Sequence, residues 1–338
     1  MMSRGMSDMN NIIEIHDLRK MYGKDVLAVD DISFDVREGE VFGFLGPNGA
    51  GKSTTISMIT TLLTPTSGTI TIGGYDVMKD STEVRKTIGL VPQSLTADDE
   101  LSGRENMELH SDLYNVPRDT AKTRIDELLK IMKLEDAADR RVDTYSGGMR
   151  KRLELAEGLI HRPKILFLDE PTLGLDIQTR EIIWEYIRNM KNENGMTVFL
   201  TTHYLEEADS LCDRIAIIDN GKIAIIGTPD ELKASLGGDI IYATIEGEDR
   251  TSDIMTIDGV SNVERTGFEY RVTVKNGDEA MTDLLSKISK NSWIISSISL
   301  HKPSMNQVFL HYTGKSLKNE STGRAEVHNE MNQMIRRR

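Results

Sequence analysis

One short segment, LGPNGAGKST at residues 45–54, constrains the fold more than any other part of the 338-residue chain. The apolar run EVFGFL precedes it, and the helical pattern STTISMITTLL follows it. Together they match G-x-x-x-x-G-K-[ST] in the strand-loop-helix context that this pattern requires. A plain glycine-rich turn is the alternative, but the four specified positions would coincide by chance only on the order of once in a hundred times. The segment therefore predicts a nucleotide-binding α/β domain.

The residues of this segment are suited to hold a triphosphate. Glycines let successive backbone N–H groups turn toward an anion, and the start of the following helix favours negative charge. We expect Lys52 to reach the β- and γ-phosphates of ATP and Ser53 to ligate Mg²⁺. The other expected contacts to ATP are Gly46, Pro47, Asn48, Gly49, Ala50, Gly51 and Thr54.

A second run, KILFLDEP at residues 164–171, ends in two carboxylates. A continuous apolar strand is typical of the interior of a parallel sheet, where ligands collect at the carboxyl ends of the strands. Adjacent residues of a strand point to opposite sides, so we expect different roles for the two acids. Asp169 would join the Mg²⁺ shell, and Glu170 would orient or deprotonate the attacking water. A pair of acids that caps a loop is the alternative.

A third segment, TYSGGMRKRLELAEGL at residues 144–159, begins a helix. Three small residues precede the helical pattern: Ser146, Gly147 and Gly148. A serine N-cap followed by a tight glycine turn would explain them in part. Three cations follow directly: Arg150, Lys151 and Arg152. The helix dipole disfavours cations in a first turn unless an anion is also present, so the segment predicts a second anion site.

The order of these three segments resembles that of ABC ATPases, over roughly residues 12–235. The variant with Tyr145 and Met149 resembles the branch that includes daunorubicin-resistance-type and other ABC-2 exporter ATPases, although Met149 stands where many members have glutamine. The resemblance implies that Ser146, Gly147 and Gly148 close on the γ-phosphate of ATP held by another copy's cradle. Two copies would thus form a homodimer around two nucleotides.

Four further positions match the family residue by residue. Tyr22 resembles the aromatic residue that stacks on adenine, although a lone Tyr could equally belong to the core. Gln93 in IGLVPQS resembles the Q-loop glutamine, which touches Mg²⁺ or water. Asp176 in LGLD resembles the D-loop aspartate that faces the opposite subunit, and His203 resembles the switch histidine that contacts the γ-phosphate. The resemblance implies two sets of residues: Lys52, Gln93, Glu170 and His203 for catalysis, and Ser53, Gln93 and Asp169 for Mg²⁺.

The expected fold class is an α/β P-loop NTPase of the ABC ATPase type, with a mixed sheet core, an antiparallel β part and a helical subdomain. Within that subdomain a proline start and an apolar stripe (Ile125, Leu128, Leu129 and Met132) predict a helix. Farther along, Asn220-Gly221 between two apolar runs predicts a hairpin.

A small C-terminal α+β domain is expected beyond the hairpin. Its predicted strands lie near residues 240–246, 260–275 and 293–299, with a helix near 279–289, and its last segment, PSMNQVFLHYTGK, resembles an extension common in the exporter branch. The predicted boundaries are a flexible N-terminus at 1–11, the ATPase domain at 12–237 with its helical subdomain at about 94–160, the C-terminal domain at 238–315 and a disordered tail at 316–338.

Composition restricts the partners. A formal net charge of −13 and a pI near 5.1 disfavour a general nucleic-acid binder, because Lys and Arg hold the phosphate backbone. The lone Cys212 and an N-terminus without an apolar core favour a cytosolic chain. No run approaches the roughly 18 apolar residues of a spanning helix, so a membrane role would require a partner.

The resemblance implies an ATP-hydrolysing subunit that powers export through a separate integral membrane permease of the ABC-2 type. Such a chain would be cytoplasmic and peripheral on the inner face of the cell membrane, with a groove near residues 93–115 that receives the permease. A soluble ABC ATPase acting on nucleic acid or ribosomes is one alternative, and a nucleotide-dependent scaffold without turnover is another. The acidic charge disfavours the first, and Glu170 argues against the second.

Overall fold

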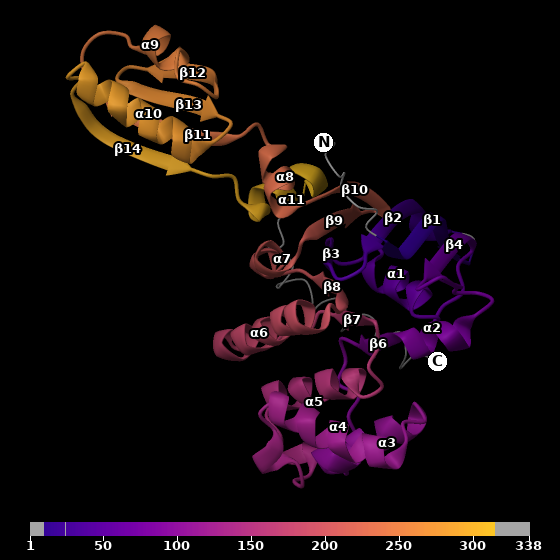
Figure 1. The fold of residues 1–338 in the computed structure, drawn as a ribbon. Helices are drawn as coiled ribbons and strands as arrows, with labels where there is room; N and C mark the ends of the chain where they lie inside the picture. Colours follow the sequence, from indigo (N-terminus) through magenta and orange to yellow (C-terminus); the bar gives the residue numbers. More distant parts are fainter. Residues whose placement is uncertain (1–9, 24, 315–338) are drawn as a thin grey trace, which may run out of the picture. The chain divides into compact units, whose positions relative to one another are not determined.

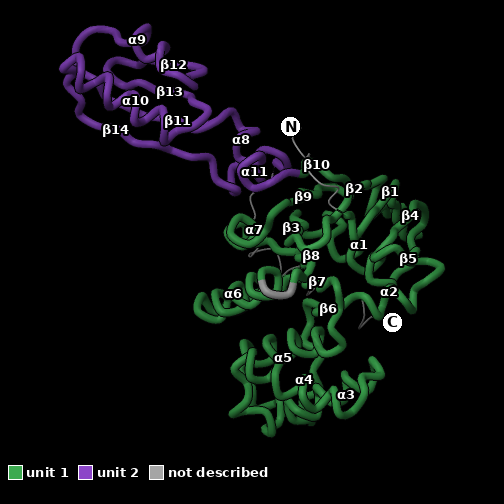
Figure 2. The backbone as a smooth tube through the Cα atoms, viewed as in Figure 1, with its two compact units in different colours: residues 1–226, 320–338 green, residues 227–319 purple. Residues whose placement is uncertain are grey.

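The computed structural model describes residues 10–23 and 25–314 (Figure 1). The chain divides after Ile226 into two compact units (Figure 2). This division comes earlier than the domain boundary at 237 that the sequence predicts. Of the expected flexible N-terminus, residues 1–9 lie outside the described residues, and Asn11 already begins a strand. The expected tail at 316–338 also lies outside them.

The first unit is built on two sheets. The larger has the order β10-β9-β3-β8-β7-β6, and its strands β9, β3, β8, β7 and β6 are parallel. The smaller is antiparallel, with the order β2-β1-β4-β5. The strands of the larger sheet are β3 (Val41–Leu45), β6 (Ile88–Val91), β7 (Ile165–Asp169), β8 (Thr197–Thr202), β9 (Arg214–Asp219) and β10 (Lys222–Gly227), and those of the smaller are β1 (Asn11–Tyr22), β2 (Val26–Arg37), β4 (Ser67–Ile72) and β5 (Tyr75–Asp76).

One apolar core joins the two sheets. Every residue of β3 and β8 is buried, as expected for strands covered on both faces. Phe34 of β2 lies 5.5 Å, between ring centroids, from both Phe42 and Phe44 of β3. Phe199 of β8 packs 5.6 Å from the same two rings. This packing fixes β3 and therefore the loop that follows it.

The predicted turn between β9 and β10 is present. Asn220 and Gly221 have φ angles of 49° and 77°, so both residues adopt the left-handed conformation that a type I′ turn requires. The turn also supports the neighbouring loop, because the Gly221 N–H donates to the carbonyl of Ala50 at 3.0 Å.

Three helices form a separate layer of the first unit. Figure 1 shows α3, α4 and α5 grouped together and apart from α1. Helix α4 buries Ile125 and Leu129 of the predicted stripe, and Met132 follows buried at its end, whereas Leu128 is half-buried. The helices of this unit are α1 (Lys52–Ile59), α2 (Ser81–Thr87), α3 (Gly103–Leu113), α4 (Arg118–Ile131), α5 (Gly147–Leu159), α6 (Ile177–Asn194) and α7 (Leu205–Leu211), with short 3-10 turns η1 (Glu135–Ala137) and η2 (Val142–Thr144).

The second unit is a small α+β fold, as predicted. Its antiparallel sheet has the order β12-β13-β11-β14, and α10 contributes to the apolar core with side chains such as Ala280, Leu284 and Ile288. The stretch 260–275, predicted as strand, is two strands, because Gly267 turns the chain with a φ of 64°. The elements are α8 (Pro229–Ala234), β11 (Asp239–Ile245), α9 (Thr251–Met255), β12 (Val260–Thr266), β13 (Glu269–Val274), α10 (Gly277–Lys290), β14 (Ile295–His301) and α11 (Met305–Thr313). In the described ranges of both units, no helix combines the length and the apolar character needed to cross a bilayer.

Candidate nucleotide site

The loop between β3 and α1 requires glycine at both ends. A Cβ atom on Gly46 would lie 2.3 Å from the carbonyl oxygen of Ile218, and one on Gly51 would lie 2.5 Å from that of Ala28. Gly51 also has a φ of 109°, which side chains disfavour. The loop is therefore pressed against neighbouring strands at both ends, while its middle residues Asn48 and Gly49 are exposed. This is the geometry of a backbone cradle open to an anion.

Lys52 begins α1 and lies across the cradle. Its side chain is buried, with 6% of the residue exposed. Its ammonium donates hydrogen bonds to the carbonyls of Gly46 at 2.7 Å and Pro47 at 3.2 Å. Ser53 follows in the first helical turn with an exposed side chain. The loop thus combines a cation, a hydroxyl and a helix N-terminus, as phosphate binding requires.

The parallel sheet brings the other predicted catalytic residues to the same edge. The register aligns the last residues of β3 and β8 and the ends of β7 and β6, so the loops after these strands meet. Gln93 Nε2 donates to Glu170 Oε2 at 3.3 Å, and His203 Nδ1 lies 3.3 Å from the same oxygen. The structure therefore groups Gln93 and His203 around the carboxylate of Glu170.

Asp169 and Glu170 have different surroundings, but strand alternation, the expected cause, does not explain the difference. Strand β7 ends at Asp169, and Glu170 leaves it with a φ of 51°, a conformation that is uncommon for residues other than glycine. Asp169 Oδ1 accepts a hydrogen bond from Thr201 Oγ1 at 2.5 Å, and the Glu170 N–H donates to the same hydroxyl oxygen at 3.1 Å. Strand alternation thus does not extend to Glu170, and Thr201 holds the strained turn.

The surroundings of Asp169 fit a divalent cation. Burial raises the pKa of its carboxyl, and the charge of Glu170 acts in the same direction, whereas the hydrogen bond from Thr201 and the charges of Lys52 and Lys151 lower it. A cation beside this carboxylate would offset the cost of its burial. Mg²⁺ typically uses one or two carboxylates with substrate phosphates and water. The described residues contain no group of three or more His, Cys, Asp or Glu side chains that could hold a metal ion.

The serine-glycine segment starts α5. Ser146 Oγ accepts the Met149 N–H at 3.3 Å, which makes Ser146 the N-cap. A Cβ atom on Gly148 would lie 2.6 Å from Thr179 Cγ2, so the first turn of α5 packs against the start of α6. Asp176 caps α6 by accepting the Thr179 N–H at 2.9 Å. The start of α5 therefore packs against the start of α6, which Asp176 caps, and Figure 1 shows α5 apart from α1.

The three cations after the glycines have partners within the protein. Arg150 Nη1 lies 2.5 Å from Asp99 Oδ1, Lys151 Nζ lies 3.1 Å from Glu154 Oε2, and Arg152 Nη1 donates to the Met132 carbonyl at 2.7 Å. Two of these partners are carboxylates, so the anions that accompany the cations come from within the protein, and the cations by themselves do not indicate an external anion. The expected second anion site therefore stays a prediction from the Ser146 hydroxyl, the glycine N–H groups and the helix start.

Tyr22 is not a core residue. It ends β1 with 44% of its surface exposed, and the Lys20 ammonium lies 5.3 Å from its ring centroid. An exposed aromatic ring can stack on a base, which the alternative of a core tyrosine could not do.

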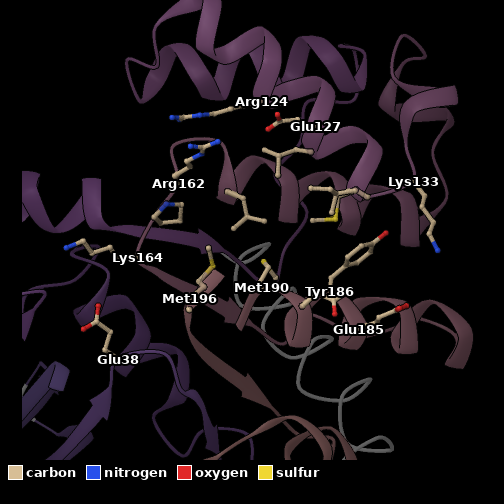
Figure 3. Close-up of a pocket in the computed structure, with 17 residues that line it drawn as sticks. Glu38, Arg124, Glu127, Lys133, Arg162, Lys164, Glu185, Tyr186, Met190 and Met196 are labelled. Carbon is tan, nitrogen blue, oxygen red and sulfur yellow. The ribbon is translucent and has the colours of Figure 1, made fainter. Parts of the chain in front are cut away.

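A large hollow lies at the other end of the sheet (Figure 3). Its volume is about 910 Å³, and its lining includes Arg124 and Tyr186 together with Lys164 and Met196, which directly precede β7 and β8. None of the predicted site residues lines it. The candidate nucleotide site at the carboxyl ends of the strands is therefore separate from this hollow.

Thr201 is a site residue that the sequence analysis missed. It is fully buried, yet its hydroxyl contacts both Asp169 and Glu170. Two hydroxyl residues at the end of the apolar strand TVFLTT were the available signal, because a buried hydroxyl requires a hydrogen-bond partner.

This fold, with a glycine-bounded loop and its lysine on the sheet and a serine-glycine helix start on a separate helical layer, is that of a P-loop ATPase of the ABC type. Residues 29–173 match the family described as ABC transporter, and residues 227–313 match the one described as ATP-binding protein DrrA1-3-like, C-terminal domain. The second match agrees with the C-terminal extension expected from the sequence.

Known proteins resemble the chain over most of its length. It is 38% identical over 312 residues to the linearmycin resistance ATP-binding protein LnrL of Bacillus subtilis, covering 91% of this chain and all of the relative. It is 40% identical over 306 residues to the daunorubicin resistance ATP-binding protein DrrA3 of Streptomyces coeruleorubidus, covering 89% and 96%. A solved ATP-binding cassette, dimeric in a post-hydrolysis state with ADP and Pi, shares 28% identity at a TM-score of 0.59, covering 64% of this chain and 98% of that one. The chain therefore belongs to the ABC transporter ATP-binding proteins, as its sequence motifs predict, and it is an ATPase.

Proposed function

We propose that this chain is the ATP-hydrolysing subunit of an exporter, in which ATP binding closes a homodimer and hydrolysis reopens it. Relatives named for resistance to linearmycin and daunorubicin support export. They also disfavour the alternative of a soluble ABC ATPase acting on nucleic acid or ribosomes.

The observation that carries this proposal is the group around Glu170. Its carboxylate contacts Gln93 and His203 at the edge of the sheet that also holds the cradle. In the proposed reaction Glu170 orients or deprotonates the attacking water, and His203 contacts the γ-phosphate. A scaffold without turnover would not need this carboxylate.

Mg²⁺ is the proposed metal. Ser53 and Asp169 would ligate it, with Gln93 as a further ligand, and it would neutralise charge on the β- and γ-phosphates. The loop residues 46–54 would bind the phosphates, and Tyr22 would stack on the adenine.

The proposed dimer completes each site from two copies. Ser146 and the two following glycines of one copy would contact the γ-phosphate bound by the other, and Asp176 would face that copy. The separation of α5 from α1 within one chain and the dimeric state of the similar cassette support this arrangement.

The proposed membrane partner is an integral permease of the ABC-2 type, which would keep the chain on the cytoplasmic face of the cell membrane. Exposed apolar side chains support a contact surface near residues 93–115: Leu95, Leu109, Leu113 and Tyr114. Co-purification from membranes tests this partner. A multi-spanning protein that stimulates ATP hydrolysis by the purified chain would support the proposal, whereas association with ribosomes or DNA alone would contradict it.

A further inference from the structure

Helix α5 contains a buried ion pair directly after the serine-glycine segment. Lys151 and Glu154 are 5% and 2% exposed, and Lys151 Nζ lies 3.1 Å from Glu154 Oε2. The desolvation of two charges usually cancels most of the attraction between them, so such a pair is weak evidence of a stabilising role. Its contacts outside the helix therefore indicate what it does.

These contacts reach the segment that contains Gln93. Lys151 Nζ donates to the carbonyl of Pro92 at 2.8 Å, and Glu154 Oε1 accepts the Thr96 N–H at 2.6 Å. Residues 92–96 follow β6 and belong to no helix or strand. The ion pair thus holds the backbone on both sides of Gln93.

Gln93 in turn contacts the carboxylate of Glu170 through its side-chain amide. A continuous polar path therefore runs from α5 through the segment around Gln93 to Glu170 and His203. A side chain on an irregular segment keeps a fixed position only when its backbone is anchored, and here α5 supplies both anchors.

We propose that Lys151 and Glu154 are positioning residues for ATP hydrolysis, which hold Gln93 against Glu170 and connect this geometry to the start of α5. The proposal rests on the proposed function, in which Gln93 and Glu170 act on ATP. Movement of α5 when Ser146 meets the partner's nucleotide would then change the position of Gln93.

The double substitution K151M/E154M tests the pair without leaving one buried charge unpaired. Two apolar side chains of similar length keep the helix packed, so the melting temperature should be unchanged or higher. We expect kcat for ATP hydrolysis to fall roughly tenfold or more and KM to change less than about threefold, because the cradle is intact. The matched control is K86M/E83M, which removes an exposed pair of the same spacing, Lys86 Nζ to Glu83 Oε1 at 2.7 Å, and should leave kcat unchanged.

A double-mutant cycle with Gln93→Ala separates positioning from general damage. If Lys151 and Glu154 act through Gln93, their substitution should add little to the loss of kcat caused by Gln93→Ala. Fully additive losses would overturn the proposal, as would a K151M/E154M protein with normal kcat. If K151M/E154M does not fold, Glu154→Gln takes its place in the cycle with Gln93→Ala, and the same comparison of kcat decides between the two outcomes. Should wild type and control both fail to hydrolyse ATP, the proposed function itself would be wrong, and the positioning role with it.

Discussion

The position of Glu170 depends on a strained turn. A left-handed conformation at a residue other than glycine costs roughly 1–3 kcal/mol and persists only where its surroundings enforce it. Thr201 enforces it here, since its hydroxyl contacts Asp169 and the Glu170 N–H. The strain directs the Glu170 carboxylate toward Gln93 and His203 rather than along the line of β7.

Substitution of Lys52 tests the cradle. Lys52→Ala removes the cation that lies across the loop, so phosphate charge would be bound and stabilised less well. We expect turnover to fall on the order of a hundredfold or more. Phosphate release and nucleotide binding, measured on the folded variant, check this. Turnover at the wild-type rate would contradict the assignment of Lys52.

Glu157 is a buried acid in the helical layer. Burial, and to a lesser extent the charge of Glu154, raise the pKa of its carboxyl to about 8, while burial lowers the pKa of His110. His110 Nε2 lies 3.5 Å from Glu157 Oε2, but both pKa shifts favour the neutral forms, so this contact joins two neutral groups and is not an ion pair.

The raised pKa of Glu157 predicts a pH dependence of stability. The folded state binds this proton more tightly than the unfolded state, so the stabilisation is complete below pH 4.5 and is lost as the pH rises to about 8. Over that range, ionisation of Glu157 would lower the free energy of unfolding by on the order of several kcal/mol. Glu157→Gln should therefore lose less stability than wild type as the pH rises, and it should be more stable than wild type at pH 8. Denaturant unfolding of both proteins from pH 5 to 9 checks this, and parallel pH profiles would contradict it.

At the element scale, α5 combines two roles at its start. Ser146 caps the helix, and in the proposed dimer the same hydroxyl contacts the partner's nucleotide. The first turn also packs on α6 through Gly148 and Thr179. A change at Ser146 should therefore affect both stability and turnover, and the two effects can be separated.

Ser146→Ala should cost about 1 kcal/mol of stability through the lost cap and should also slow turnover. Ser146→Asn keeps a capping oxygen and should restore the stability without restoring full turnover. Nucleotide binding by an isolated subunit should change little in both variants, because the proposed phosphate contact crosses to the partner. Unfolding, ATP affinity and phosphate release measured together test this. An equal loss of binding and turnover in Ser146→Ala would contradict it.

The elements differ in how far the sequence predicts them. The cradle and β7 follow from local patterns, because glycine positions and uninterrupted apolar runs have few alternatives. The turn at Gly267 was missed, since one glycine in a strand pattern is ambiguous. Glu170's departure from β7 and the partners of Arg150 depend on tertiary contacts that no local pattern contains. For the same reason, sequence order alone could not show that Lys151 and Glu154 reach the segment of Gln93.

At the scale of the whole molecule, the proposed reaction centre is divided between copies. One chain groups Lys52, Asp169 and Glu170 at the edge of its parallel sheet, and it holds Ser146 on a separate helical layer. A triphosphate in the cradle would bring together two surfaces that are each incomplete. The two copies should therefore associate only when nucleotide is bound, and the dimer should persist only when hydrolysis is slow.

Glu170→Gln provides the corresponding test. The amide has nearly the same shape but cannot accept a proton from water, so ATP should bind while its cleavage slows by orders of magnitude. We expect light scattering to show a dimer with ATP and Mg²⁺ and a monomer with ADP. Adding Lys52→Ala to Glu170→Gln should abolish the dimer, because the bridging triphosphate is no longer held. A Glu170→Gln protein that binds ATP yet stays monomeric would contradict a site completed by two copies, and full hydrolysis by an isolated monomer would do so as well.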